Sequence, residues 1–207
     1  MKAIIILILI MGASLCAACQ QEATPSAPDP TATMQHTETP QLDRDIEEIA
    51  VYSALLEDSF IGDIEQFLIV DQTRVPSPGL MEQNLAEFQE NKPLDKELVA
   101  NFLEVNQQPS PLDPNMDISL EYQLMTQEEI DELAPLDEAS GWQLFEEKYP
   151  KAVGFIYLSR VGFNADLSQA LVYYDRYYYD QPIMGGYFLL TRQDGRWVTE
   201  SSFEWMT

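Results

Sequence analysis

Residues 155–205 decide the fold of this chain, through four runs that read FIYLSRVGF (155–163), QALVYYDRYY (169–178), GYFLLTR (186–192) and RWVTESSFEW (196–205). All four are rich in β-branched and aromatic residues, which favour strands. Short polar segments separate them, and the last is the pair Asp194-Gly195. An Asp-Gly pair is typical of a type I′ hairpin turn, which needs positive φ at both central residues. We therefore expect an antiparallel meander of four or five strands.

The preceding half of the domain has mainly helical patterns. Residues 43–58 carry apolar side chains at helical spacing, which predicts an amphipathic helix. Further helices are expected at 80–88, 95–105, 127–133 and 141–148, and single strands at 66–71 and 118–125. The fold class predicted from this order is α+β, with N-terminal helices packed on one face of a four- to five-stranded antiparallel meander sheet.

The first 18 residues have the pattern of a secretion signal. Lys2 precedes an apolar run at 3–11, and small residues lead to Cys19. The segment 1–18 is therefore predicted to be a signal peptide. The residues before Cys19 resemble a bacterial lipobox, with Cys16 in place of the usual aliphatic residue. Because of this resemblance, we expect Cys19 to be lipidated. Several acyl chains on one cysteine would give stable membrane anchoring.

Residues 19–41 are predicted to form the lipidated cysteine and a disordered tether, since they are rich in Thr, Pro and Ala and have no apolar periodicity. The globular domain is expected at 42–207. These assignments place the chain in the cell envelope, anchored to a membrane by lipid, with the domain exposed outside the cytoplasm.

The net charge of −24 limits the partners of the domain. Nucleic acid and anionic lipid are repelled by such a charge, so neither is expected to bind the domain. The expected partners are the membrane, through the lipid anchor, and a protein or carbohydrate ligand of unknown identity.

The domain has few of the groups on which enzyme chemistry depends. The one histidine, His36, lies in the tether, and both cysteines precede residue 20. Catalytic triads and histidine-ligated zinc are therefore disfavoured. The spacing of Asp113, Asn115 and Asp117 resembles a calcium loop, but Ile118 replaces the turn glycine. No cofactor, metal ligand or catalytic residue is predicted.

The run of tyrosines at 173–179 is the most suggestive candidate for a binding surface. Strand alternation directs Tyr174, Arg176 and Tyr178 to one face and Asp175 to the other. Aromatic rings with polar tips suit sugar or peptide recognition. These four residues are the predicted ligand-binding residues, with structural packing of the same strand as the alternative. Elsewhere, Arg160 is expected to pair with an acid of the helical half, and Trp197, Phe203 and Trp205 to share one core face.

The sequence also resembles a group of uncharacterised bacterial lipoproteins. The motifs that carry the resemblance are Leu158-Ser159-Arg160-Val161-Gly162-Phe163-Asn164, Gly185-Gly186-Tyr187 and Asp194-Gly195-Arg196-Trp197. Several such proteins have cysteine in the loop before the paired glycines, where this chain has residues 180–184 without one, so no disulfide or metal role carries over. The resemblance implies an envelope lipoprotein of this architecture and no particular activity.

Three functions remain open from the sequence. The anchor, the tether and the tyrosine strand favour a non-enzymatic binding or interaction domain. One alternative is a carboxylate- or tyrosine-dependent hydrolase of envelope polymers, which would need two carboxyl groups at a suitable separation. The other is an acidic inhibitor of a basic partner protein, marked by salt-dependent affinity.

Overall fold

The computed structural model describes residues 41–59, 66–118, 121–133, 139–179 and 181–206. Contacts divide the chain into two units, Met1–Glu38 and Thr39–Thr207, and every described residue belongs to the second unit. The predicted signal peptide and Cys19 lie outside the described residues. Within the described part, no helix combines the length and apolar character needed to cross a membrane.

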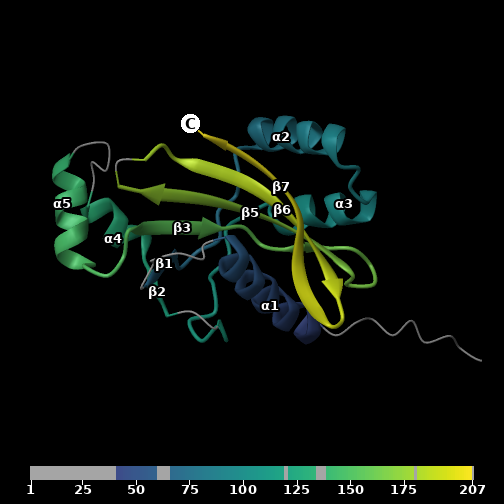
Figure 1. The fold of residues 1–207 in the computed structure, drawn as a ribbon, viewed down its shortest axis with the longest axis horizontal. Helices are drawn as coiled ribbons and strands as arrows, with labels where there is room; N and C mark the ends of the chain where they lie inside the picture. Colours follow the sequence, from purple (N-terminus) through teal and green to yellow (C-terminus); the bar gives the residue numbers. More distant parts are fainter. Residues whose placement is uncertain (1–40, 60–65, 119–120, 134–138, 180, 207) are drawn as a thin grey trace, which may run out of the picture. The chain divides into compact units, whose positions relative to one another are not determined.

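A single seven-stranded sheet forms the centre of this unit (Figure 1). Six strands follow the order β2-β1-β3-β5-β6-β7. The short strand β4 pairs with the same edge of β5 as β3 does. The strands are β1 (Phe67–Val70), β2 (Tyr122–Met125), β3 (Gly154–Leu158), β4 (Gly162–Phe163), β5 (Gln169–Tyr178), β6 (Met184–Gln193) and β7 (Arg196–Met206). The helices are α1 (Gln41–Ser59), α2 (Pro78–Asn91), α3 (Lys96–Val105), α4 (Gln127–Glu132) and α5 (Ala139–Lys148).

The fold is therefore mixed α/β with a mostly antiparallel sheet, and the expected number of four or five strands is too low. The extra strands come from the first half of the domain, where β1 pairs in parallel with both β2 and β3. All four residues of β1 are apolar and buried, as is usual for a parallel strand covered on both faces. Parallel neighbours need crossover connections, and α2 to α5 lie in those connections.

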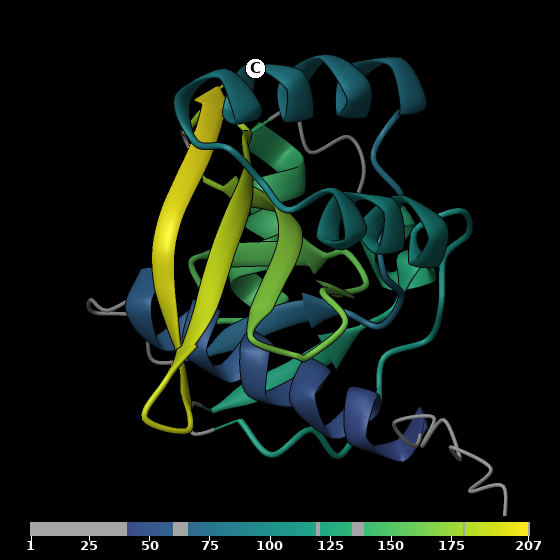
Figure 2. The same ribbon diagram turned by 90° about the vertical axis from the view of Figure 1, so that its right-hand side faces the viewer.

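Helices cover both faces of the sheet, so the expectation of one covered face is wrong (Figure 2). The α1 face contains Val51, Leu55 and Leu56 of α1 against Ile156, Val172 and Leu190. The opposite face has two clusters. The α2 and α3 cluster packs on Leu171, Tyr173 and Tyr187, and the α4 and α5 cluster packs on Leu68, Val70 and Phe155.

The turn between β6 and β7 has the predicted geometry, with φ of 51° at Asp194 and 81° at Gly195. Further along β7, the register shifts by one residue: Leu190 lies opposite Thr199, but Leu189 lies opposite Ser201. Glu200 is the extra residue, and such a bulge reverses the face of every later side chain. Trp197 consequently packs on the α1 face, whereas Phe203 and Trp205 pack against the opposite cluster. The expectation that all three share one face is wrong.

Candidate functional site

A bulge separates β3 from β4. Polar groups of this bulge face α1 and form a polar junction with it. Leu158 lies opposite Tyr174 of β5, whereas Gly162 lies opposite Leu171, so β3 and β4 together contain one more residue than β5 over this interval. Between them, the backbone N–H of Ser159 donates to the carbonyl of Tyr173 at 2.8 Å, and the Ser159 hydroxyl accepts from the Tyr173 N–H at 2.9 Å. Ser159 is thus fixed to β5, although residues 159–161 leave the regular ladder.

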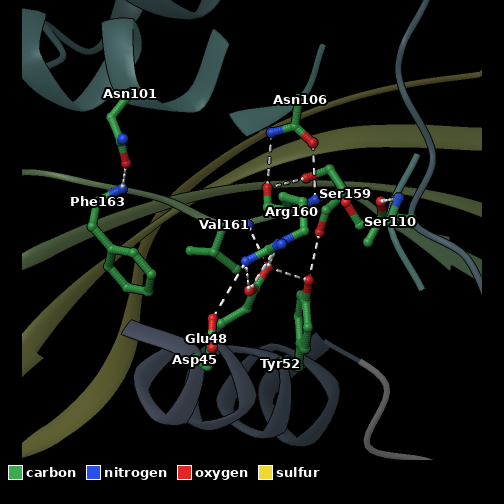
Figure 3. A network of polar contacts seen from close by, with 11 residues as sticks. Asp45, Glu48, Tyr52, Asn101, Asn106, Ser110, Ser159, Arg160, Val161 and Phe163 are labelled. Carbon is green, nitrogen blue, oxygen red and sulfur yellow. Dashed lines mark hydrogen bonds and ion pairs between the residues drawn. The ribbon is translucent and has the colours of Figure 1, made fainter. Parts of the chain in front are cut away.

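Arg160 and Glu48 form the centre of this junction (Figure 3). The Arg160 Nε lies 2.8 and 2.9 Å from the two Glu48 oxygens, and its Nη2 lies 2.7 Å from Oε2. Burial alone would lower the pKa of Arg160, but the hydrogen bonds and charge of Glu48 raise it overall. The pair joins α1 to the β3–β4 bulge, which confirms the predicted ion pair between Arg160 and an acid of the helical half.

The remaining acceptor capacity of Glu48 is also used. Its Oε1 accepts from the backbone N–H of Val161 at 2.9 Å and from the Tyr52 hydroxyl at 2.8 Å. The Tyr52 oxygen also lies 2.7 Å from the Ser159 carbonyl. Burial is the main cause that raises the pKa of Tyr52, followed by the charge of Glu48.

Helix α3 fixes the other side of the junction. The side chain of Asn106 accepts from the Arg160 N–H at 2.9 Å and donates to the Arg160 carbonyl at 3.0 Å. Gly162 follows Arg160 by two residues, and a Cβ on Gly162 would lie 2.5 Å from the Cα of Phe102. Only glycine lets α3 approach the strand this closely.

These contacts identify the run 158–164 as a structural joint. A cavity of about 350 Å³ lies beside it, lined by Asp45, Glu48, Tyr52 and Arg160. Glu48 already accepts from Arg160, Tyr52 and a backbone N–H, and Asp45 lies 3.6 Å from Arg160. A carboxylate with these contacts is held in place by the protein and is poorly placed for proton transfer.

The structure does not bring the four predicted ligand-binding residues together at one site. Tyr174 is buried on the α1 face, and its hydroxyl donates to Glu204 at 3.0 Å. Arg176 is half-buried, with its guanidinium carbon 4.6 Å from the centre of the Tyr178 ring. Among these four residues, Tyr178 lines a described pocket. Ligand binding by all four residues remains a prediction.

Asp175 lies on the opposite face of β5 and pairs with Arg74. The Arg74 Nε lies 2.7 Å from Asp175 Oδ2, and the Tyr173 hydroxyl donates to Oδ1. Burial raises the pKa of Asp175, although the Tyr173 hydrogen bond and the charge of Arg74 oppose this shift. The guanidinium of Arg74 also lies 4.7 Å from the centre of the Tyr157 ring. A Cβ on Gly185 would lie 2.9 Å from Asp175 Oδ1, which explains the first glycine of the Gly185-Gly186 pair.

A larger cavity lies where the end of β5 meets α5. It measures about 590 Å³ and is lined chiefly by Phe145, Glu146, Tyr149, Tyr178, Tyr179 and Gln181. We name it the tyrosine pocket. Its volume falls in the usual range for small-molecule sites, and its wall combines aromatic rings with a few polar groups, as is common in such sites.

The tyrosines of this pocket differ in how firmly they are fixed. The Tyr149 hydroxyl donates to Glu129 at 3.0 Å, and the side chain is buried. Burial, followed by the hydrogen bond to Glu129, raises the pKa of Tyr149. Tyr179 is 50% exposed and contacts Trp142, with 5.9 Å between the ring centres. Tyr179 therefore offers the accessible ring surface.

Most of this pocket could not be predicted from the sequence, because its wall combines α5 and the residues after it with the end of β5. Phe145 and Glu146 lie in a segment whose helical pattern was recognised, and Tyr149 directly follows it. The pattern alone does not indicate that its C-terminal end meets Tyr178 and Tyr179. The tyrosine run was the only available signal.

The segment 113–117, whose spacing resembles a calcium loop, contains a hydrogen bond between two of its own residues. Asp113 accepts a hydrogen bond from the Asn115 backbone N–H at 2.8 Å. In the described part of the chain, no group of three or more histidine, cysteine or acidic side chains is arranged to bind a metal ion.

Comparison with known proteins adds no relative: no protein-family model, no curated protein and no solved structure matches the chain. The resemblance to uncharacterised bacterial lipoproteins therefore stays a prediction from the sequence motifs.

Proposed function

We propose that this chain is a lipid-anchored protein of a bacterial cell envelope, whose domain binds a small ligand in the tyrosine pocket without transforming it. The observation that carries the proposal is the pocket itself, with about 590 Å³ of space and an accessible tyrosine on its wall. The membrane anchor is proposed from the signal pattern and from Cys19.

The chemistry of the wall supports binding over hydrolysis. Its described lining contains one carboxylate, Glu146, together with the hydroxyls of three tyrosines. Hydrolysis of a glycosidic bond with two protein carboxyl groups requires a second one across the site. Among the described lining residues there is neither a second carboxylate nor an amine.

A ligand screen tests the binding proposal. We would purify the full chain with Cys19→Ala, which cannot be acylated at that position, and record thermal shifts against sugars, peptidoglycan fragments, amines and divalent ions. A ligand of the tyrosine pocket should raise the melting temperature of this chain and should not do so after the additional change Tyr179→Ala. Mass spectrometry should recover the ligand unchanged; recovery of a cleaved product would favour the hydrolase.

A labelling experiment tests the anchor separately. Cells that express the wild-type chain should incorporate radioactive palmitate into it, and cells that express Cys19→Ala should not. Equal labelling of the two chains would exclude Cys19 as the site of lipidation.

A further inference from the structure

The tyrosine pocket has the chemistry of a cation site. Its described lining contains one acidic side chain, Glu146, which is exposed, and no lysine or arginine. The ring faces of tyrosine attract cations, and a nearby carboxylate adds a counter-charge. We propose that the ligand is an organic cation with a substituted ammonium group, which contacts the ring of Tyr179 with Glu146 as its counter-ion. This inference rests on the proposed binding function of the same pocket.

Two tyrosines of the wall already interact with cations of the protein. The guanidinium carbon of Arg176 lies 4.6 Å from the ring centre of Tyr178, and Nζ of Lys148 lies 5.5 Å from that of Tyr149. In the described structure, no protein cation lies over the ring of Tyr179, which is 50% exposed. Tyr179 therefore has ring surface available for an external cation.

Two lysines adjoin the lining residues in the sequence, Lys148 and Lys151, and both are paired with carboxylates. Nζ of Lys148 lies 3.3 Å from Glu129 and 3.5 Å from Glu132, so its charge is offset by two carboxylates. Nζ of Lys151 lies 3.8 Å from Glu121. The whole chain has a net charge of −24. A field of this sign raises the local concentration of cations and lowers that of anions. An anionic ligand would also need basic groups, which the described lining lacks.

A comparison of choline with 3,3-dimethylbutan-1-ol tests the inference. The two molecules have nearly the same shape, but the second has carbon in place of the charged nitrogen. Isothermal titration of the Cys19→Ala chain should show that choline binds about tenfold more tightly than the uncharged alcohol. Raising the salt concentration should weaken choline binding and leave the alcohol unaffected.

Two neighbouring acids of α5 provide a matched control. Glu146→Gln should weaken choline binding about three- to tenfold, whereas Glu147→Gln removes the same charge from an exposed position outside the described lining and should change it much less. Both side chains are exposed, so neither variant should impair folding. Tyr179→Ala should abolish choline binding.

The outcomes separate this inference from the function on which it rests. If choline and the alcohol bind equally, and both are lost in Tyr179→Ala, the pocket binds ligands but the cation preference is overturned. Binding of a neutral sugar or a peptide in the same pocket, with no binding of choline, would also overturn the cation preference and leave the binding function intact. If choline, the alcohol and every compound of the wider screen fail to bind, the proposed function itself is overturned.

Discussion

Two polar regions of this domain differ in how completely their groups are used. In the structural joint at residues 158–164, Glu48 accepts from Arg160, Tyr52 and a backbone N–H and is 7% exposed. In the tyrosine pocket, Tyr179 is 50% exposed and Glu146 is exposed to solvent. Buried polar groups must be satisfied within the protein, whereas exposed groups around a cavity can exchange water for a ligand. This difference supports a structural role for the first region and the proposed binding role for the second.

The largest expected effect comes from breaking the Glu48–Arg160 pair. Glu48→Ala leaves the Val161 N–H without its acceptor and leaves Arg160 with Asp45 as its nearest carboxylate, 3.6 Å away. Removal of one partner of a buried ion pair costs about 3–5 kcal/mol, which is an upper bound here because the Arg160 side chain is 29% exposed. Urea unfolding monitored by fluorescence would measure the change. Glu57→Ala, at an exposed position of the same helix, is the matched control and should cost less than about 0.5 kcal/mol. Equal costs for the two variants would contradict the structural role of the joint.

The second effect tests the close approach of α3 to β4. In Gly162→Ala, the new Cβ would lie 2.5 Å from the Cα of Phe102, and the helix would have to move. We expect a loss of about 1–3 kcal/mol in the free energy of unfolding, as for other overpacked interiors. Gly79→Ala is the control, because a Cβ there meets nothing within 4 Å and the position is helical. That change should be neutral or should stabilise the protein by up to about 1 kcal/mol.

Asp175 lies on β5, between Tyr173, which contacts the structural joint, and Tyr178, which lines the tyrosine pocket. Its buried carboxyl gives a pH-dependent prediction. Burial raises the pKa of the Asp175 carboxyl above its usual range. The folded state therefore retains a proton that the unfolded chain has lost, so stability falls as the pH rises from the unfolded to the folded pKa. In Asp175→Asn this contribution is absent. The stability of the wild type relative to the variant should decrease as the pH rises from about 4 and then level off.

Urea unfolding of both chains across the same pH series measures this difference, because most other titrating groups cancel. Arg74→Gln sharpens the test. It removes the charge that opposes the raised pKa of Asp175, so the decrease should extend to higher pH. A difference between wild type and Asp175→Asn that does not change with pH would contradict the assignment.

The sequence was most informative where structure depends on neighbouring residues. The pair Asp194-Gly195 predicts its own turn because the required φ values belong to those two residues. The charge of Arg160 among apolar neighbours predicts an acidic partner. It does not identify Glu48, which lies 112 residues earlier and is selected by the packing of α1 on the sheet.

Two bulges limited what alternation along a strand could predict. Glu200 reverses the faces of the later residues of β7, so Trp197 and Trp205 lie in different clusters. The residue types around a bulge permit a regular strand equally well, and pairing with the neighbouring strand decides between the two. The tyrosine pocket was unpredictable for a related reason, since α5 and the end of β5 meet only through the tertiary fold.

The smallest expected effect is the loss of one hydroxyl from the tyrosine pocket, and the matched change in the structural joint is its reference. Tyr52→Phe removes an oxygen that lies 2.8 Å from Glu48 and 2.7 Å from the Ser159 carbonyl, so a buried acceptor loses its donor at a cost of about 1–3 kcal/mol. Tyr179→Phe removes a hydroxyl from a side chain that is 50% exposed, and water replaces its contacts. The free energy of unfolding should then change by less than about 0.5 kcal/mol. Both variants delete one tyrosine hydroxyl. The difference between their changes in the free energy of unfolding therefore measures how strongly each region depends on its polar contacts. A cost at Tyr179 equal to that at Tyr52 would show that the tyrosine pocket is also built for stability.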